Sequence, residues 1–297
     1  MVALPGPHVR YWGVGMDAKT ALLTLSALIA FASNSLLTRL ALGAHAVDAA
    51  TFTLVRLVSG AGVLALVVWT RARTLAPLRG RGALGPVALF CYAAPFSFAY
   101  LRIGAAVGAL ILFGVVQLTM IGTGIFRGER PAAMTWLGVG LSTAGLLAIT
   151  VPSVSRPDPV GVALMAIAGV AWAVYTLAGK TASDPVAANA WSFVGAGVLA
   201  TIPRLSAHAV AAPSARGLAL ALVSGGVTSG LGYAVWYRVL PRLSVMQAAI
   251  SQLSVPVLAA FGAALLLREH LSARFLVCAA AVLVGVGIVL SSRAKKR

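Results

Sequence analysis

A few polar side chains interrupt long apolar runs of the sequence, and they carry most of the chemistry that it offers. Asn34 and Arg56 lie in the first two runs, each about 12 Å from the same predicted membrane surface at 1.5 Å per helical residue. A buried arginine is costly unless it is paired or faces water. We therefore expect Arg56 either to bind a substrate carboxylate or to join the two helices through contact with Asn34.

Two glutamines and two aromatic residues are further candidates for a substrate site. Gln117 and Gln252 lie at similar predicted depth in separate apolar runs, where they either line a cavity or join helices by hydrogen bonds. Trp172 and Tyr175 share one predicted helix and are candidate aromatic cavity residues. The predicted substrate-binding residues are thus Asn34, Arg56, Gln117, Trp172, Tyr175 and Gln252.

Three more aromatic residues, Tyr233, Trp236 and Tyr237, fall near the end of a predicted helix. Aromatic side chains gather at membrane surfaces, so we expect these three in an interfacial belt. Just before them, the glycines between Gly225 and Gly230 predict close approach of neighbouring helices. No lysine follows as in a phosphate-binding loop, so nucleotide binding is not expected there.

Three residues suggest structural or gating roles. Glu129 and Glu269 stand at the ends of two similar runs, where we expect salt bridges or helix caps, with gating or coupling as the alternative. Pro256 is expected to bend its helix, because proline removes a backbone hydrogen bond. The earlier run has no proline at the matching place, so its bend is expected to be lost or replaced at Gly114 and Gly122.

Several kinds of chemistry are missing from the sequence. No Asp or Glu lies in the middle of an apolar run, and the histidines fall in loops or near run ends, so a buried proton relay is not predicted. A membrane enzyme acting on lipids would need a constellation of His, Asp, Ser or metal ligands at one surface, and none is evident. We therefore expect no enzymatic activity, no metal and no cofactor.

Composition places these residues in a membrane protein. Of 297 residues, 60% are hydrophobic and 10% are charged, whereas soluble domains are nearer half apolar and a quarter charged. Long apolar runs in lipid must be helices, because the backbone has to satisfy its own hydrogen bonds. The net charge of +17 fits basic loops at a membrane surface, and no nucleic-acid-binding motif accompanies it.

The apolar runs predict an all-α membrane protein with ten transmembrane helices. A cytoplasmic extension over 1–19 precedes a first repeat over 20–151, a proline-rich linker over 152–159, a second repeat over 160–291 and a basic cytoplasmic tail over 292–297. The predicted spans are Thr20–Leu42, Asp48–Thr70, Ala83–Leu101, Ala105–Phe126, Ala132–Val151, Val160–Gly179, Ala188–Leu205, Leu218–Tyr237, Val245–Leu267 and Leu271–Ser291.

The two halves resemble each other at an offset of 140 to 141 residues. Gly122 then aligns with Gly262, and Glu129 with Glu269, which is informative because the chain has only 6 acidic residues. Five helices per half is an odd number, so the second half enters the membrane inverted, as in many transporters. With both termini in the cytoplasm, 15 Lys and Arg residues lie inside and 7 outside, which favours that orientation.

Two stretches resemble the EamA family of the drug/metabolite transporter superfamily. They are the glycine-led, tryptophan-bearing helix Gly161–Lys180 and the proline-to-glutamate helix Ser251–Ser272. Asn34 and Arg56 match positions where that family often has the same residue types. The resemblance implies a central substrate cavity and export of small metabolites, such as amino acids or related compounds, across the bacterial inner membrane by alternating access.

Other functions stay open at this point. A lipid or lipid-linked-sugar flippase shares the same fold class, and an integral membrane enzyme is a third alternative. The expected partners are a small-molecule substrate and the lipid bilayer, with a homodimer possible and no nucleic acid.

Overall fold

The computed structural model describes residues 17–43, 45–75, 82–103, 105–151, 157–206, 212–268 and 270–292, which contain helices and no strand. Each of the predicted spans contains helix, with ends shifted by a few residues. The first half holds α1 (Ala18–Gly43), α2 (Ala49–Ala72), α3 (Leu84–Ala99), α4 (Ala105–Phe126) and α5 (Ala133–Thr150). The second half holds α6 (Pro159–Lys180), α7 (Pro185–Ser206), α8 (Ala215–Val223), η3 (Ser224–Leu231), α9 (Gly232–Val239), η4 (Leu240–Arg242), α10 (Val245–Ser251), α11 (Ser254–Leu267) and α12 (Ala273–Ser291).

Several of these helices join end to end into longer rods. α8, η3, α9 and η4 make one span over Ala215–Arg242, and α10 with α11 makes another over Val245–Leu266. Within the described residues, 9 spans are long and apolar enough to cross a membrane. α3 has 16 residues, or about 24 Å at 1.5 Å per residue, which is shorter than the hydrocarbon core. The chain is therefore a multi-pass membrane protein.

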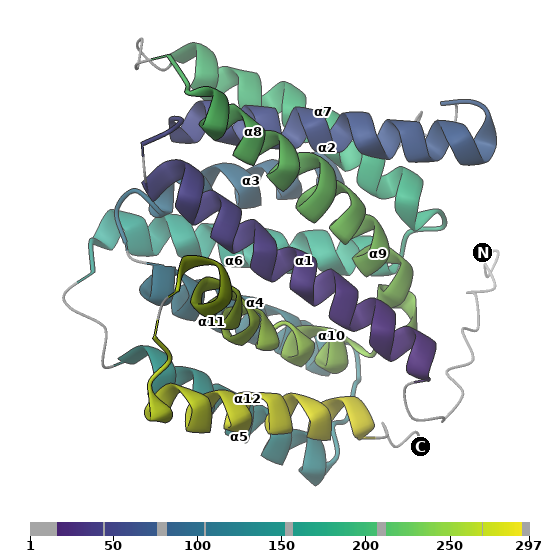
Figure 1. The fold of residues 1–297 in the computed structure, drawn as a ribbon. Helices are drawn as coiled ribbons and strands as arrows, with labels where there is room; N and C mark the ends of the chain where they lie inside the picture. The colour runs from purple at the N-terminus through teal and green to yellow at the C-terminus, as the bar shows by residue number, and fades with distance from the viewer. Residues whose placement is uncertain are drawn as a thin grey trace, which may run out of the picture.

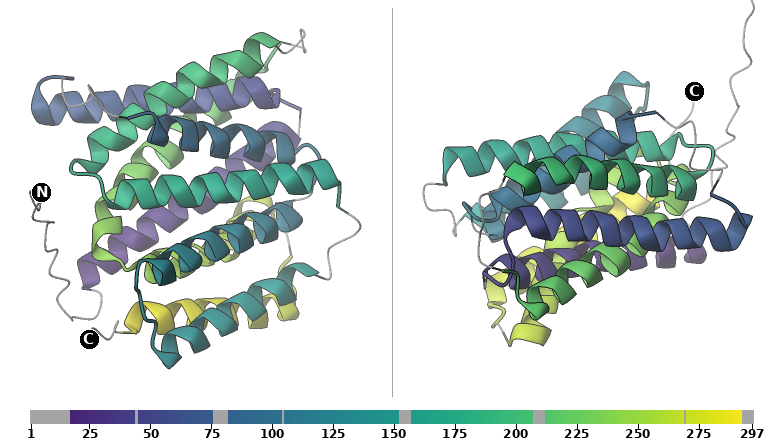
Figure 2. Two further views of the ribbon diagram at one scale, coloured as in Figure 1. Left: turned by 180° about the vertical axis from the view of Figure 1, so that it is seen from behind. Right: turned by 90° about the horizontal axis from the view of Figure 1, so that it is seen from above.

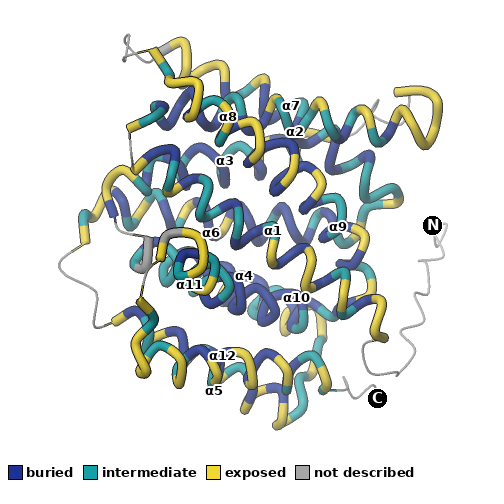
Figure 3. The backbone as a smooth tube through the Cα atoms, viewed as in Figure 1, coloured by how far each residue is buried: buried dark blue, intermediate teal, exposed yellow. Residues whose placement is uncertain are grey.

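Exposed apolar side chains cover the outer surface of the helices. Leu118 is 78% exposed, Val277 71% and Leu265 82%, as suits side chains that face lipid. Figure 3 shows the buried backbone in the middle of the bundle and the exposed backbone along its rims and ends. In a bilayer the exposed rim is the lipid-facing surface.

Two hydrogen bonds and one ion pair near helix ends show which of these ends lie together. At one end, Arg242 donates to Thr20 at the start of α1, and Gln247 at the start of α10 donates to Leu290 near the end of α12. At the other end, Arg102 before α4 pairs with Asp158 before α6. The first turn of α1 and the last turn of α12 consequently lie on the same side of the bundle (Figure 1).

The helices form a layered bundle in which α5 and α12 make one edge and α2, α7 and α8 make the opposite edge (Figures 1 and 2). α3 packs on α6 and α7, and α4 packs on α6. The span Ala215–Arg242 packs on α1 and α2, and α11 packs on α1. Three further contacts between the halves are those of α2 with α7, α4 with α10, and α5 with α12.

Glycine allows two of these contacts to be unusually close. A Cβ on Gly285 of α12 would lie 2.6 Å from the carbonyl oxygen of Gly138 on α5. A Cβ on Gly225 of η3 would lie 2.1 Å from the carbonyl oxygen of Arg56 on α2. The predicted close packing at the glycine-rich segment is thus confirmed. Here η3 is a π-helix, a form that is rare and often found at functional sites.

The helix is interrupted just before Pro256, where a bend was predicted. The helix breaks at Gln252 and Leu253, between α10 and α11. Proline at position 256 cannot donate to the carbonyl of Gln252, and Val255 donates to that oxygen instead, at 3.1 Å. α4, which lacks a proline, runs unbroken past Gly114 and Gly122.

Some predicted features lie outside the described residues. They are Glu269, most of the extension over 1–19, most of the linker over 152–159 and most of the tail over 292–297.

Candidate functional site

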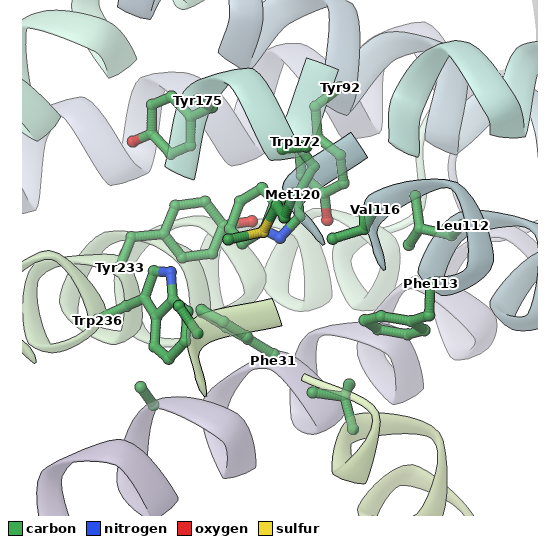
Figure 4. Close-up of a cluster of buried hydrophobic side chains, with 14 of the residues drawn as sticks. Phe31, Tyr92, Leu112, Phe113, Val116, Met120, Trp172, Tyr175, Tyr233 and Trp236 are labelled. Carbon is green, nitrogen blue, oxygen red and sulfur yellow. The ribbon is translucent and has the colours of Figure 1, made fainter. Parts of the chain in front are cut away.

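An aromatic cluster fills the centre of the bundle. Phe31 of α1, Tyr92 of α3, Trp172 of α6 and Tyr233 of α9 turn their rings toward one another (Figure 4). Trp172 lies 4.8 Å from Tyr92, 4.9 Å from Tyr233 and 5.4 Å from Phe31 between ring centroids. Such tilted and edge-to-face arrangements are the favoured ones for aromatic pairs. Both halves of the chain therefore contribute rings to one cluster.

A small central cavity lies against this aromatic cluster. Its volume is about 20 Å³, which is room for about one water molecule. Three of the predicted substrate-binding residues, Asn34, Trp172 and Gln252, line it. The full lining comes from both halves of the chain: Phe31, Asn34, Ser35, Tyr92, Phe96, Leu112, Phe113, Trp172, Tyr233, Gln252 and Val255.

A larger cavity, the vestibule, continues from the central one between α1, α3, α4, α5, α11 and α12. Its volume is about 210 Å³, and it shares Ser35, Phe96, Leu112, Phe113 and Val255 with the central cavity. The rest of its lining is mostly apolar, with a few polar groups: Leu36, Arg39, Tyr100, Ala109, Leu146, Ile149, Thr150, Pro256, Ala259, Ala260, Ala263 and Phe275. Arg39 and Thr150 place it toward the ends of α1 and α5.

Arg56 is buried behind the wall of the central cavity rather than in its lining. Its side chain is 1% exposed, and Nε donates to Ser229 Oγ at 2.9 Å while Nη2 donates to Tyr233 Oη at 2.8 Å. The guanidinium carbon also lies 5.5 Å from the ring centre of Tyr92 and 6.0 Å from that of Phe96. Its Nη1 has no hydrogen-bond partner among the described residues. Cavity-lining rings thus stand between this cation and the cavity.

Asn34 and Arg56 meet through η3 and not by direct contact. The Asn34 carbonyl oxygen accepts from Ser224 Oγ at 2.6 Å, with longer contacts to Thr228 at 3.4 Å and Ser229 at 3.5 Å. Ser229 therefore contacts both predicted residues. The reason is that η3 lies between α1 and α2 and packs on both of them.

The two glutamines have different surroundings. Gln252 accepts from Trp172 Nε1 at 2.5 Å and donates to the backbone oxygen of Ala248 at 2.9 Å. Its position in the break between α10 and α11 turns the amide toward the central cavity. Gln117 is 5% exposed, contacts Thr143 at 3.4 Å and leaves its Nε2 without a partner in the described part of the chain. Gln117 lies near the cavity without lining it.

Tyr175 lies one turn from Trp172, outside the cavity lining. Its hydroxyl donates to Asn189, and its backbone oxygen accepts from the Tyr237 hydroxyl at 2.9 Å. The expectation of an interfacial belt for the aromatic group of α9 is wrong. Tyr233 is 1%, Trp236 0% and Tyr237 2% exposed. α9 packs on α1, α6 and α7, which covers these rings.

Glu129 is a helix cap, one of the two roles expected for it. Its carboxylate accepts from the backbone amides of Val245 at 2.8 Å and Met246 at 3.3 Å, at the first turn of α10. An anion stabilises this end of a helix, where backbone N–H groups lack partners. The loop after α4 is thereby tied to the span that carries Pro256 and Gln252.

Several residues around the site were not identified from the sequence as part of it. Ser224 and Ser229 stand in the glycine-rich segment, whose composition suggested packing alone. Phe31 and Phe96 look like ordinary apolar residues in a chain of this composition. Only the spatial arrangement shows that they surround Asn34 and Arg56. No group of His, Cys, Asp or Glu suited to a metal ion occurs among the residues that the structure describes.

The bundle of apolar spans around a cavity built from both halves defines a polytopic membrane protein of transporter-like architecture. The chain belongs to the EamA-like transporter family, whose sequence model matches residues 159–291. An uncharacterized protein of Pseudomonas aeruginosa is 47% identical over 277 residues, covering 93% of this chain and 96% of that protein. An uncharacterized transporter of Archaeoglobus fulgidus is 27% identical over 221 residues, or 71% of this chain and 77% of that one.

A solved crystal structure has the same fold. Its TM-score is 0.78 at 18% sequence identity, and the match covers 93% of this chain and 99% of the solved one. At this identity the likeness concerns the fold alone.

Proposed function

We propose that the protein exports small metabolites, such as amino acids or related compounds, by alternating access through the central cavity. The observation that carries this proposal is the composition of the cavity wall. Phe31, Asn34 and Tyr92 come from the first half, and Trp172 and Gln252 come from the second. A site between two halves can be exposed to either side of the membrane when the halves rock against each other.

The packing of the helices supports two inverted five-helix repeats. The counterparts by sequence order are α1 and α6, α2 and α7, α3 and the span Ala215–Arg242, α4 and the span Val245–Leu266, and α5 and α12. Exchanging every helix for its counterpart turns α3 with α6 into the span Ala215–Arg242 with α1, α3 with α7 into that span with α2, and α4 with α6 into α11 with α1, all of which are packed pairs. A two-fold relation between the halves accounts for this, and five spans per half make it an inverted one.

The bacterial inner membrane, with both termini in the cytoplasm, suits this arrangement. The count of 15 inside and 7 outside basic residues supports the orientation. The vestibule then lies toward the outer side, because Arg39 and Thr150 stand at the ends of α1 and α5 that face away from the cytoplasm.

Within this proposal the predicted site residues have separate roles. Asn34, Trp172 and Gln252 contact the substrate, whereas Arg56, Gln117 and Tyr175 support them from behind the lining. Pro256 shapes the break that presents Gln252. Glu129 holds the cytoplasmic end of the cavity, and Glu269 is its sequence counterpart.

Counterflow in proteoliposomes tests the proposal. Vesicles loaded in turn with amino acids, purines, organic acids, polyamines and quaternary dyes should exchange at least one class, and Trp172→Ala should lower that rate by about tenfold. Val277→Ala, on the lipid-facing side of α12, is the matched control and should leave it unchanged.

Three outcomes would contradict the proposal. Exchange of fluorescent phospholipids without exchange of any water-soluble compound would instead support a flippase. Formation of a chloroform-extractable product by the purified protein would support an enzyme. Equal exchange by the wild type and Trp172→Ala would remove the central cavity from the transport path.

A further inference from the structure

The charge of Arg56 has no carboxylate partner in the described part of the chain. The 5 described acids all accept hydrogen bonds from backbone amides in the first turn of a helix. They stand at helix ends, and they are Asp17, Asp48, Glu129, Asp158 and Asp184.

The partners that Arg56 does have are neutral. Ser229 and Tyr233 accept its hydrogen bonds, and the rings of Tyr92 and Phe96 lie within 6.0 Å of its guanidinium carbon. A guanidinium does not lose its proton in proteins. The centre of the bundle therefore holds a full positive charge, and within the described part of the chain it is compensated by dipoles and ring faces alone.

This charge acts on the central cavity. Tyr92, Phe96 and Tyr233 contact Arg56 on one side and line the cavity on the other. In surroundings of low polarity a charge is screened far less than in water. Among the described residues, none that lines the central cavity or the vestibule is acidic.

The polar groups of the cavity point to the same charge preference. The side-chain oxygen of Asn34 already accepts from Ser224, and that of Gln252 already accepts from Trp172. Each of these oxygens has two lone pairs and has already given at least one of them to a buried donor, so an ammonium group entering the cavity would find fewer acceptors free. The aromatic rings, in turn, offer a surface for an apolar body of a ligand.

We propose that the central cavity and the vestibule select organic monoanions with an apolar body over neutral and cationic molecules of the same shape. The inference rests on the proposed transport function, and it narrows the substrate class of that site. Arg56 is the residue that sets the preference, acting through the cavity wall. An amino acid, with its ammonium group, is then a weaker ligand than the corresponding carboxylate without it.

A matched series of ligands tests the preference by calorimetric titration of the purified full-length protein in detergent. The series is 3-phenylpropionate, 3-phenylpropionamide and 3-phenylpropylamine, which share one body and differ in charge. The carboxylate should bind at least about tenfold more tightly than the amide, as expected for one charge in weakly screened surroundings. The amine should bind more weakly than the amide.

Substitutions then locate the source of the preference. Arg56→Gln should abolish the tenfold difference, and Arg56→Lys should keep most of it. Arg39→Gln is the matched control at an exposed cation, where salt screens the interaction. Its effect should vanish at high salt, whereas the effect of Arg56→Gln should persist.

The inference is overturned if the wild type binds the amine as tightly as the carboxylate. This comparison uses the wild-type protein alone, so it does not depend on whether any variant folds. It is also overturned if folded Arg56→Gln keeps the preference. Failure of the transport proposal would give a different result. Binding would still depend on ligand charge in the titration, but proteoliposomes would exchange none of the ligands.

Discussion

At the scale of single residues, Asn34 combines two roles that a substitution can separate. It lines the central cavity and also accepts a hydrogen bond from the buried Ser224. Thr38, one turn further on α1, is equally buried and donates to the backbone oxygen of Asn34 without lining the cavity. Substituting Asn34 or Thr38 therefore separates two effects. Both substitutions remove a buried hydrogen bond, but only the substitution of Asn34 also removes a side chain that lines the cavity.

Asn34→Ala should therefore lower both stability and transport. We expect a loss of about 1 kcal/mol in the free energy of unfolding, since hydrogen bonds between membrane helices contribute about 0.6 kcal/mol each on average. Transport per folded molecule should fall by about tenfold. Thr38→Ala should lower stability by a similar amount and leave transport unchanged. Thermal unfolding in detergent and counterflow measure the two effects, and a matching loss of transport in Thr38→Ala would refute the distinction.

Single residues also show which features of the site could be predicted from the sequence and which could not. Asn34, Arg56 and Gln252 were selected as candidates because polar side chains are conspicuous in apolar helices. The connection of Asn34 with Arg56 through Ser229 was not predicted, because it depends on η3 lying between α1 and α2. The burial of Tyr233 was missed for a similar reason: position along a helix does not tell which of its faces other helices cover.

At the scale of helices, the pairing of α5 with α12 depends on glycine at the contact. A Cβ on Gly285 would lie 2.6 Å from a backbone oxygen of α5, whereas a Cβ on Gly287, on the same helix, would meet nothing within 4 Å. A backbone atom cannot move aside as a flexible side chain can. The two helices would have to separate to accept the added methyl group.

Gly285→Ala should thus destabilise the protein by about 1–3 kcal/mol, the usual cost of overpacking. Gly287→Ala is the matched control and should be neutral or slightly stabilising, because alanine favours helix more than glycine does. Thermal unfolding in detergent checks both variants. Equal stability of the two would show that the α5–α12 contact is not close in the membrane protein.

The break in the span Val245–Leu266 has no equivalent in α4. Pro256→Ala would allow the backbone ladder to continue across Gln252, which should straighten the span and draw the amide of Gln252 away from the cavity. We expect transport to slow by about tenfold or more, and more than in Val116→Ala, which only shortens a buried side chain of α4. Initial rates of counterflow measure this. Greater slowing in Val116→Ala would contradict the role assigned to the break.

The helical spans themselves were predicted well from the sequence. Long apolar runs and the lipid environment leave helices as the available structure, so α4 was placed at Ala105–Phe126, as observed. The break at Gln252 followed from Pro256. The π-helical form of η3 was not predicted from any pattern in the sequence; it occurs where α2 approaches Gly225 closely.

At the scale of the whole molecule, the two ends of the cavity differ. Toward the ends of α1 and α5 the central cavity continues into the vestibule, through shared residues such as Ser35. Toward the other end, Trp236 and Tyr237 are buried, and Glu129 ties the loop after α4 to α10. The central cavity thus continues into the vestibule at one end and is covered by buried side chains at the other, an asymmetry that the proposed alternating access expects of a single state.

The most direct test of alternating access is a reciprocal change in accessibility at these two ends. Cys91 and Cys278 are first replaced by alanine, and single cysteines are then placed at Ser35, in the vestibule, or at Ser251, which is fully buried on α10. A membrane-impermeant maleimide is added from one side of sealed vesicles. With Glu129 intact, Ser35→Cys should react from the outer side and Ser251→Cys should be protected from the cytoplasmic side.

Glu129→Gln weakens the cap on α10 and should shift the population toward the state open to the cytoplasm. The account predicts that labelling at Ser35→Cys falls while labelling at Ser251→Cys rises, each by a few-fold, as for a shift of about 1 kcal/mol between two states. A rise at both positions would indicate an open pore, and no change at either would show that Glu129 does not hold the closed end; either result would contradict the account.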